Sequence, residues 1–392
     1  MAQLIINSLL LVLILLFVQL FSSVKAAVYD LTDFGAKSDG ETDSSKSFLS
    51  AWDAACGSPE PATIHVPAGF FLVGQITFSG PCKSSKITLQ IDGTLVAPSY
   101  DSLGKVGEWM VFAQVEGVSV HGGTIDGRGS SLWSCKAAGG SCPDGATSLA
   151  FKSSKDIMIS GLTSINSEMF HIVIDDCQGV TVQGVKITAP GSSPNTDGIH
   201  VQGSADVTIT GTGIKTGDDC ISIGPGTTNI WIEQVTCGPG HGISIGSLGK
   251  EYDEEGVENV TVRTAVFTGT QNGLRIKTWG RPSQGFVRGV VFEHATMQNV
   301  QNPIIIDQNY CNGHRGCADK SSGVKISEVT YTDIQGSSAS QVAMNFDCSA
   351  SNPCSGIELQ DIKLTYENQP AEASCNHADG TTSGFVVPPS CL

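Results

Sequence analysis

One short pattern recurs along most of the chain and limits the folds that it can adopt. Each copy is a small or turn-forming residue followed by apolar, polar and apolar residues, as in Gly179-Val180-Thr181-Val182. Alternation of apolar and polar residues is typical of a β-strand with one buried face, and Gly, Asn and Asp favour turns. The copies lie at 117–120, 156–159, 179–182, 206–209, 229–232, 259–262, 289–292, 323–326 and 356–359.

Successive copies are roughly 23 to 39 residues apart, and this spacing predicts a solenoid. The chain lacks the Leu-x-x-Leu-x-Leu frame of leucine-rich repeats. A propeller blade needs four strands in about 40 residues, which the shortest spacings cannot hold. We therefore predict an all-β fold, a single-stranded parallel β-helix with three short strands per coil and loops of variable length.

A solenoid needs protected ends, and two segments are candidates. Residues 44–56 form the clearest helical stretch, and Asp43 or Ser44 could be its N-cap. The residues on its apolar face are Phe48, Trp52 and Ala55. We expect this short helix to cap the N-terminal end, and the segment from Glu367 onwards to protect the other end. No Pro- or Ser-rich linker divides the chain, so we expect one domain.

The first residues predict secretion. An apolar run at 4–21 is followed by small residues, with Val24 and Ala26 at the two positions that define a cleavage site. We expect residues 1–26 to be a secretory signal peptide, leaving residues 27–392 as the β-helix domain. The alternative is an uncleaved signal anchor, because the run is about long enough to span a bilayer.

The chain has thirteen cysteines, which suit an oxidising compartment. Sequence alone does not determine connectivity, but pairing between near neighbours would leave Cys177 alone. The expected pairs are Cys56–Cys82, Cys135–Cys142, Cys220–Cys237, Cys311–Cys317, Cys348–Cys354 and Cys375–Cys391. No Cys-x-x-Cys pair occurs, which argues against structural zinc. Asn259 begins the one usable N-glycosylation sequon after the signal.

The charge balance excludes one class of partner. The chain has 38 acidic and 22 basic residues and a net charge of −16. A protein that binds duplex nucleic acid normally presents a basic surface, so we expect no nucleic acid partner.

Four polar clusters interrupt the apolar repeat. They are Asn195-Thr196-Asp197-Gly198, Gly217-Asp218-Asp219-Cys220, Gly240-His241-Gly242 and Arg275-Ile276-Lys277. Asp197 and Asp218 are 21 residues apart, and Asp219 and His241 are 22 apart, which matches one short coil. Residues one coil apart stack at about 4.8 Å. We therefore expect the three carboxylates and the imidazole on successive rungs of one face.

A cationic pair follows at the distance of one longer coil. Arg275 and Lys277 alternate around Ile276, so their side chains point to the same side of a strand. Tyr310 lies 33 residues after Lys277, which is plausible for one further coil. Cations beside carboxylates suit an anionic substrate.

The carboxylate cluster indicates acid–base chemistry. Neighbouring carboxylates cannot all ionise freely, so at least one pKa rises and an acid can coexist with a base. Glycoside hydrolysis needs this pair, because one carboxyl protonates the leaving oxygen and another activates water. Each motif alone has a plainer interpretation: Asp-Gly is common in turns, adjacent aspartates could ligate calcium, and Arg-x-Lys often marks an exposed strand. Their common coil register favours a site.

At these motifs the sequence resembles the polygalacturonases, the pectin-cleaving glycoside hydrolases. NTDG, GDDC, GHG and RIK occur in that family's order, and the longer strings SPNTDGIH, GDDCISIG, GPGHGISIGSLG and NGLRIKTW are similar to the plant pollen-type, exo-acting branch. The resemblance covers essentially the whole chain after the signal. It implies a right-handed parallel β-helix that hydrolyses α-1,4-galacturonosyl links with inversion and without metal or other cofactor.

The resemblance also implies roles for the catalytic residues. Asp218 would be the general acid, and Asp197 and Asp219 would hold and activate the water. His241 would tune the protonation of the acid and contact the sugar.

The same resemblance assigns substrate binding. Arg275 and Lys277 would bind the galacturonate carboxylate, while Tyr310 and Asn195 would line the subsite. We expect a monomeric enzyme, secreted to the plant cell wall, that acts from the non-reducing end.

Three alternatives stay open on the sequence. Endo action is one, because the sequence does not show whether loops block an end of the cleft. A calcium-dependent pectate lyase on a similar scaffold is the second, since the aspartate cluster could bind calcium. A non-catalytic wall protein that binds pectin is the third, although it would have no reason to keep the acids.

Overall fold

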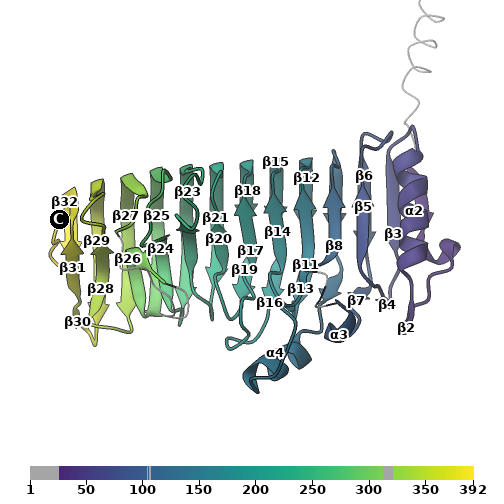
Figure 1. The fold of residues 1–392 in the computed structure, drawn as a ribbon, viewed down its shortest axis with the longest axis horizontal. Coiled ribbons are helices and arrows are strands. Elements are labelled where there is room, and N and C mark those ends of the chain that lie inside the picture. The colour runs from purple at the N-terminus through teal and green to yellow at the C-terminus, as the bar shows by residue number, and fades with distance from the viewer. Residues whose placement is uncertain (1–25, 104, 106, 312–320) are drawn as a thin grey trace, which may run out of the picture.

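The computed structural model describes residues 26–103, 105, 107–311 and 321–392. These residues form one right-handed parallel β-helix, as the resemblance implies, with strands stacked along the long axis of the molecule. Figure 1 shows α2 at the N-terminal end of the stack and the C terminus at the other. The expected signal segment lies outside the described residues. Among the described residues, no helix is long and apolar enough to cross a membrane.

The elements are β1 (Ala27–Asp30), η1 (Leu31–Phe34), β2 (Asp39–Asp43), α2 (Ser45–Gly57), β3 (Ala62–Val66), β4 (Phe70–Leu72), β5 (Ile76–Ser79), β6 (Ile87–Ile91), β7 (Thr94–Val96), α3 (Tyr100–Leu103), β8 (Glu108–Ala113), β9 (Val118–His121), β10 (Thr124–Asp126), α4 (Ser130–Ala137), β11 (Thr147–Lys152), β12 (Lys155–Ser160), β13 (Thr163–Ile165), β14 (Ile172–Asp175), β15 (Gln178–Gln183), β16 (Lys186–Thr188), β17 (Ile199–Gln202), β18 (Ala205–Thr210), β19 (Gly213–Lys215), β20 (Ile221–Ile223), β21 (Thr228–Cys237), β22 (Ile243–Leu248), β23 (Val257–Thr268), β24 (Asn272–Trp279), β25 (Phe286–Val300), β26 (Asn302–Tyr310), β27 (Lys325–Ser338), β28 (Val342–Asp347), β29 (Cys354–Tyr366), β30 (Gln369–Pro370), β31 (Glu372–Asn376) and β32 (Ala378–Val387).

One sheet carries the site and has one strand from each coil. In the described residues its order is β5-β8-β11-β14-β17-β20-β22-β24-β26-β28-β31, and neighbouring strands are parallel. We call this sheet the floor sheet. The remaining long strands, such as β15, β18 and β21, form the opposite wall of the coil.

The number of strands per coil changes along the chain. The prediction of three is correct up to β19, but β21 pairs with both β18 and β19, so later coils have two. The corner between the second and third strands persists, because the residue there keeps a positive φ. Gly184 (63°) and Gly211 (61°) occupy this corner in early coils, and Gln234 (57°) and Thr264 (54°) occupy it later. The bend is therefore kept in later coils although glycine no longer occupies it.

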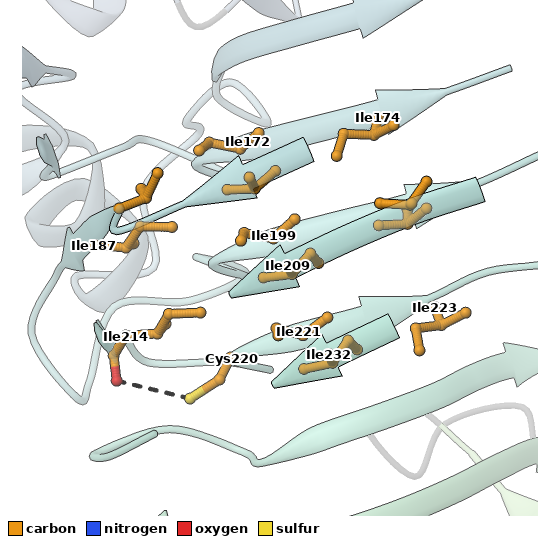
Figure 2. Close-up of a cluster of buried hydrophobic side chains, with 14 of the residues drawn as sticks. Ile172, Ile174, Ile187, Ile199, Ile209, Ile214, Cys220, Ile221, Ile223 and Ile232 are labelled. Atoms are coloured by element: carbon orange, nitrogen blue, oxygen red, sulfur yellow. Dashed lines mark hydrogen bonds between the residues drawn. The ribbon is translucent and has the colours of Figure 1, made fainter. Parts of the chain in front are cut away.

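The interior is a stack of aliphatic side chains in register. Ile199 pairs with Ile221 and Ile221 with Ile243, and all three are fully buried. Figure 2 shows Ile side chains of consecutive coils meeting inside the stack, with those of Ile209 and Ile232 coming from the opposite wall. Each buried side chain of this size contributes about 1.5–3 kcal/mol relative to exposure.

The predicted N-terminal capping helix is confirmed. Helix α2 begins at Ser45 after the N-cap residue Ser44, and Asp43 Oδ1 accepts a hydrogen bond from Ser45 N at 2.9 Å. Its buried face consists of Phe48, Ala51, Trp52 and Ala55. Trp52 Nε1 also donates to the carbonyl of Ser79 in β5 at 3.1 Å, which fastens the helix to the first strand of the floor sheet.

The C-terminal segment from Glu367 contributes the last coil of the solenoid. Strands β31 and β32 extend both walls of the solenoid by parallel pairing with β28 and β29. The Cys375–Cys391 disulfide closes this coil.

Five of the six predicted disulfides are present, and the sixth, Cys311–Cys317, includes a residue outside the described part of the chain. The five are Cys56–Cys82, Cys135–Cys142, Cys220–Cys237, Cys348–Cys354 and Cys375–Cys391. Cys177 is a buried free thiol, as expected. Burial raises the pKa of Cys177 to about 11, so this thiol is a packing residue with little nucleophilic character.

Candidate active site

The polar clusters meet at one edge of the floor sheet. Asp197 lies two residues before Ile199, Asp219 two before Ile221, and His241 two before Ile243. Because these isoleucines are paired in register, Asp197, Asp219 and His241 fall on equivalent positions of three consecutive coils. The backbone agrees, since Gly198 N donates to the carbonyl of Asp219 at 2.9 Å. The prediction of successive rungs is confirmed, but the partner of Asp197 in register is Asp219 and not Asp218.

Asp219 is buried and both of its oxygens are bonded. Ser244 Oγ donates to Oδ1 at 2.7 Å, and Lys277 Nζ donates to Oδ2 at 2.6 Å. Lys277 is only 7% exposed. Burial, the largest single influence, lowers the pKa of Lys277, but the charge and hydrogen bond of Asp219 together with Tyr310 outweigh it and the net direction is upward. The pair is therefore a buried ion pair.

Asp218 faces the imidazole of His241. Its Oδ1 lies 3.0 Å from His241 Nδ1 and also accepts the backbone N–H of Asp219 at 2.9 Å. Burial raises the pKa of Asp218, but the hydrogen bond and charge of His241, together with Lys277, outweigh burial and hold it below its usual value. The imidazole therefore controls the protonation of this carboxyl.

Asp197 is the carboxyl that holds a proton most readily. Burial, followed by the charges of Asp218 and Asp219, raises the pKa of Asp197 well above its usual value. Lys277 opposes this shift, as does a 2.8 Å hydrogen bond from Ser222 Oγ to Asp197 Oδ2. The sequence predicted that one of the three carboxyls would have a raised pKa, and the structure assigns it to Asp197.

The cations and Tyr310 form the next part of the site, as predicted. Arg275 and Lys277 lie on β24, and the Tyr310 ring is centred 5.2 Å from Arg275 Cζ and 5.3 Å from Lys277 Nζ. Within the described residues, the buried Nε of Arg275 has no hydrogen-bond partner. Arg275 itself lines the cleft, so its positive charge lies beside any anionic ligand bound there.

All eight predicted site residues line one cleft, which has a volume of about 540 Å³. Asn195 is exposed at its rim and contributes a neutral amide. Ile305, Asp307 and Asn309 line the cleft one coil beyond Arg275 and Lys277.

Comparison with known proteins identifies the family. The model of the glycosyl hydrolases family 28 matches residues 56–385, most of the chain. The chain belongs to glycosyl hydrolase family 28. It is 60% identical over 382 residues to a polygalacturonase of Prunus persica, covering 96% of this chain and 97% of the relative. It is 44% identical to an exopolygalacturonase of Platanus acerifolia, covering 92% of this chain and 97% of that protein.

A solved structure has the same fold. An exopolygalacturonase from Thermotoga maritima is 20% identical, and the two structures align with a TM-score of 0.76 over 92% of each chain. This supports the right-handed β-helix. The sequence resemblance to plant polygalacturonases is likewise confirmed.

Sequence reasoning missed several residues of this family-28 site. Ser222 donates a hydrogen bond to Asp197, and Ser244 donates one to Asp219; each serine lies one coil after its aspartate. His200 Nδ1 lies 2.8 Å from Ser222 Oγ. Phe170 lies in the cleft wall one coil before Asp197. Placing the Ile-Ser-Ile strands in register with the aspartates would have found the serines. Phe170 carries no such signal, because it occurs within a loop.

The acidic cluster of this family-28 site fits a metal ion poorly. One ligand atom from each of Asp218, Asp219 and His241 lies within 4.8 Å of the others, a spacing that a cation could use. Both oxygens of Asp219 already accept from Ser244 and Lys277, however. A divalent cation would also have to sit beside the Lys277 ammonium, which repels it.

Proposed function

We propose that this chain is a secreted hydrolase that cleaves the α-1,4-galacturonosyl links of polygalacturonate with inversion of configuration. One observation carries the proposal: three carboxyls from two consecutive coils lie beside a buried lysine and an arginine that line the same cleft. The first group supplies acid and base, and the second selects an anionic sugar. Family 28 membership and the polygalacturonase relatives support the same substrate.

Asp218 acts as the general acid. As the bond between the anomeric carbon and the bridging oxygen breaks, Asp218 donates its proton to that oxygen, which leaves as a hydroxyl. In the free protein, His241 and Lys277 lower the pKa of this carboxyl. A bound galacturonate carboxylate adds negative charge next to Lys277. We therefore expect substrate binding to raise the pKa of Asp218 and load the acid when it is needed.

Asp219 and Asp197 hold the attacking water. Asp219 is paired with Lys277 and so is present as a carboxylate, which can accept a proton as water attacks the anomeric carbon. Asp197 shares the same water and hydrogen-bonds to Ser222. The water proton passes to this pair and the hydroxyl joins the sugar from the face opposite the leaving group, which gives inversion.

Arg275, Lys277, Tyr310 and Asn195 bind the sugar. Arg275 and Lys277 both line the cleft, where their positive charges can bind a carboxylate. Tyr310 covers both cations and restricts their movement. The subsite then discriminates against a neutral sugar, which would leave the cations without a counter-charge.

The test is product analysis on de-esterified polygalacturonate. We expect new reducing ends, a first-formed product of inverted (β) configuration by proton NMR, and unchanged rates in EDTA. A calcium-dependent product that absorbs in the ultraviolet would instead establish a lyase. Binding of polygalacturonate without release of reducing ends would establish a non-catalytic binding protein.

We also propose that the enzyme works as a monomer in the plant cell wall after loss of residues 1–26. Exposed Asn259 on β23 would carry its glycan away from the cleft, because its strand is on the opposite wall. N-terminal sequencing of the secreted protein should begin at Ala27, and gel filtration should give one chain. Retention of the first 26 residues in a membrane fraction would indicate a signal anchor.

A further inference from the structure

The outward side chains of the floor sheet change character along the axis. One row, read coil by coil, consists of Val111, Ala150, Val173, His200, Ser222, Ser244, Arg275, Ile305 and Asn345. Val111, Ala150 and Val173, the three residues directly before His200, are apolar although they point away from the core. Thr77, which pairs with Val111 one coil earlier, is exposed. The first side chain of this row that hydrogen-bonds to one of the acids is Ser222, one coil after His200.

The apolar part of this row is covered. Val111 is 6% exposed, Ala150 0% and Val173 8%, and they form a cluster separate from the main core. Ala113 and Phe170 pack against the cluster. We call Phe170 with Val111, Ala150 and Val173 the apolar stop. Val111, Ala150 and Val173 leave no floor surface on which a sugar could lie, and Phe170 is half-buried beside them.

Phe170 marks the boundary between the covered floor and the open cleft. Because Ile172 pairs with Ile199, Phe170 occupies the coil position directly before Asp197. It lines the cleft, and its ring centroid lies 5.1 Å from that of His200. The distance of one coil, about 4.8 Å, separates the stop from the acids and leaves room for about one sugar ring.

On the other side of the acids, the described residues continue the cleft. Ile305 and Asp307 are half-buried, Asn309 is exposed, and all three line the cleft beyond Arg275 and Lys277. A polymer can extend in that direction from the scissile bond. Among the described residues, the cleft therefore ends at Phe170 on its N-terminal side and continues beyond Lys277 on its C-terminal side.

We propose that the apolar stop ends the cleft on its N-terminal side and makes this enzyme remove one galacturonate at a time from a chain end. This rests on the proposed function. The stop acts by excluding the next sugar of an internal segment: a chain that ran through the site would have to displace Phe170 from its apolar contacts. Only a chain end avoids that displacement.

The experiment compares products from long polygalacturonate in the first few per cent of hydrolysis. The wild-type protein should release monomer, with little loss of viscosity per new reducing end. Phe170→Ala should give dimer and longer products, raising the ratio of oligomer to monomer by roughly tenfold, the scale on which reshaping an apolar pocket changes specificity. The matched control is Phe385→Ala on β32, a strand of the opposite wall, where the ring is 60% exposed.

Each outcome decides a separate claim. A ladder of oligomers from the wild type would overturn the stop while leaving hydrolysis intact, even if Phe170→Ala fails to fold. Monomer alone from a folded, active Phe170→Ala would show that Phe170 does not end the cleft. Absence of any reducing-end release from the wild type would contradict the proposed function itself. Thermal unfolding of each variant verifies that folded proteins are compared.

Discussion

Inward and outward residues of the same floor strands have opposite requirements. On β17, β20, β22 and β24, the inward row consists of Ile199, Ile221, Ile243 and Leu274, and the outward row of His200, Ser222, Ser244 and Arg275. The inward residues are nearly interchangeable because each only fills the stack. The outward residues all differ because each contacts a different partner. On each strand, the residues that point inward stabilise the fold, and the alternating residues that point outward form the active site.

The largest effect should come from removing the acid. We expect Asp218→Asn to lower kcat by about 10²–10⁴-fold, the usual value of a general acid, with little change in thermal unfolding. Asp206→Asn is the matched control, because Asp206 is exposed on β18 of the opposite wall. Initial rates of reducing-end release measure the effect. Retention of more than a tenth of the activity would show that another group donates the proton.

Replacing an inward residue should lower stability and leave activity unchanged. Ile232 is fully buried in β21, so Ile232→Ala should lower the free energy of unfolding by about 2–5 kcal/mol. Activity per folded molecule should not change, because the residue lies on the wall away from the cleft. Its outward neighbour supplies the control: Trp231 pairs with Thr208 and Thr261, so Trp231→Thr should cost less than about 1 kcal/mol. If denaturant titrations showed equal losses of unfolding free energy for the two variants, inward and outward residues would not differ in their contribution to stability.

A serine of the outward row should have a smaller effect. Burial raises the pKa of Asp197, and the hydrogen bond from Ser222 opposes this. Ser222→Ala removes the opposition, so the pKa of Asp197 should rise further. If Asp197 must be ionised to hold water, the acidic limb of the kcat/KM profile moves to higher pH. We expect about a tenfold loss at mildly acidic pH, the value of one hydrogen bond to a charged group.

The control for that profile is Ser134→Ala, whose hydroxyl bonds only to the Ser130 carbonyl in α4. Its pH profile should superimpose on the wild type. An unshifted acidic limb in Ser222→Ala would mean that Asp197 is not required in its ionised form.

The smallest effect should come from a surface cluster far from the cleft. His65 lies between Asp30 (2.8 Å) and Asp92 (3.0 Å), and their hydrogen bonds outweigh burial and raise its pKa. A raised pKa stabilises the fold fully below the unfolded-state value of about 6.5 and loses this contribution as pH rises through the folded-state pKa. The lowered pKa values of the two aspartates set the lower limit of the window.

Replacing this histidine should therefore have a pH-dependent cost. The gap in unfolding temperature between wild type and His65→Gln should be widest at mildly acidic pH and should shrink in alkaline buffer. His121, whose charge also lowers the pKa of Asp92, should be varied in parallel as His121→Gln. A gap that is constant with pH would show that His65 contributes packing only. Hydrolysis rates should not change.

Much of the fold could be predicted because the apolar–polar–apolar repeat is recognisable in the sequence. Apolar residues before and after each turn fix the strands, and the spacing of Asp219 and His241 fixes the coil that joins them. The strand number of later coils was not predictable, since Gln234 adopts the same left-handed corner as Gly211 without resembling it. A corner defined by a backbone angle leaves no signature in residue type.

The sequence predicted which residues form the site better than it predicted the contacts among them. The residues that the motifs named all line the cleft, yet the direction of each pKa shift depends on contacts between coils. Lys277 reaches Asp219 across 58 positions of sequence, and spacing alone cannot reveal that contact. The apolar stop was invisible for another reason: Val111, Ala150 and Val173 look like core residues, and only the register places them outside.

The stacking of coils has a further consequence for how such an enzyme can vary. Asp197, Asp219, His241 and the cations come from four successive coils, and the cleft continues past them over β26. Adding or removing whole coils on that side would lengthen or shorten the grip on the polymer without altering the distances among Asp197, Asp219 and Lys277. The length of the polymer-binding cleft and the chemistry of the site are therefore set by different coils of one chain.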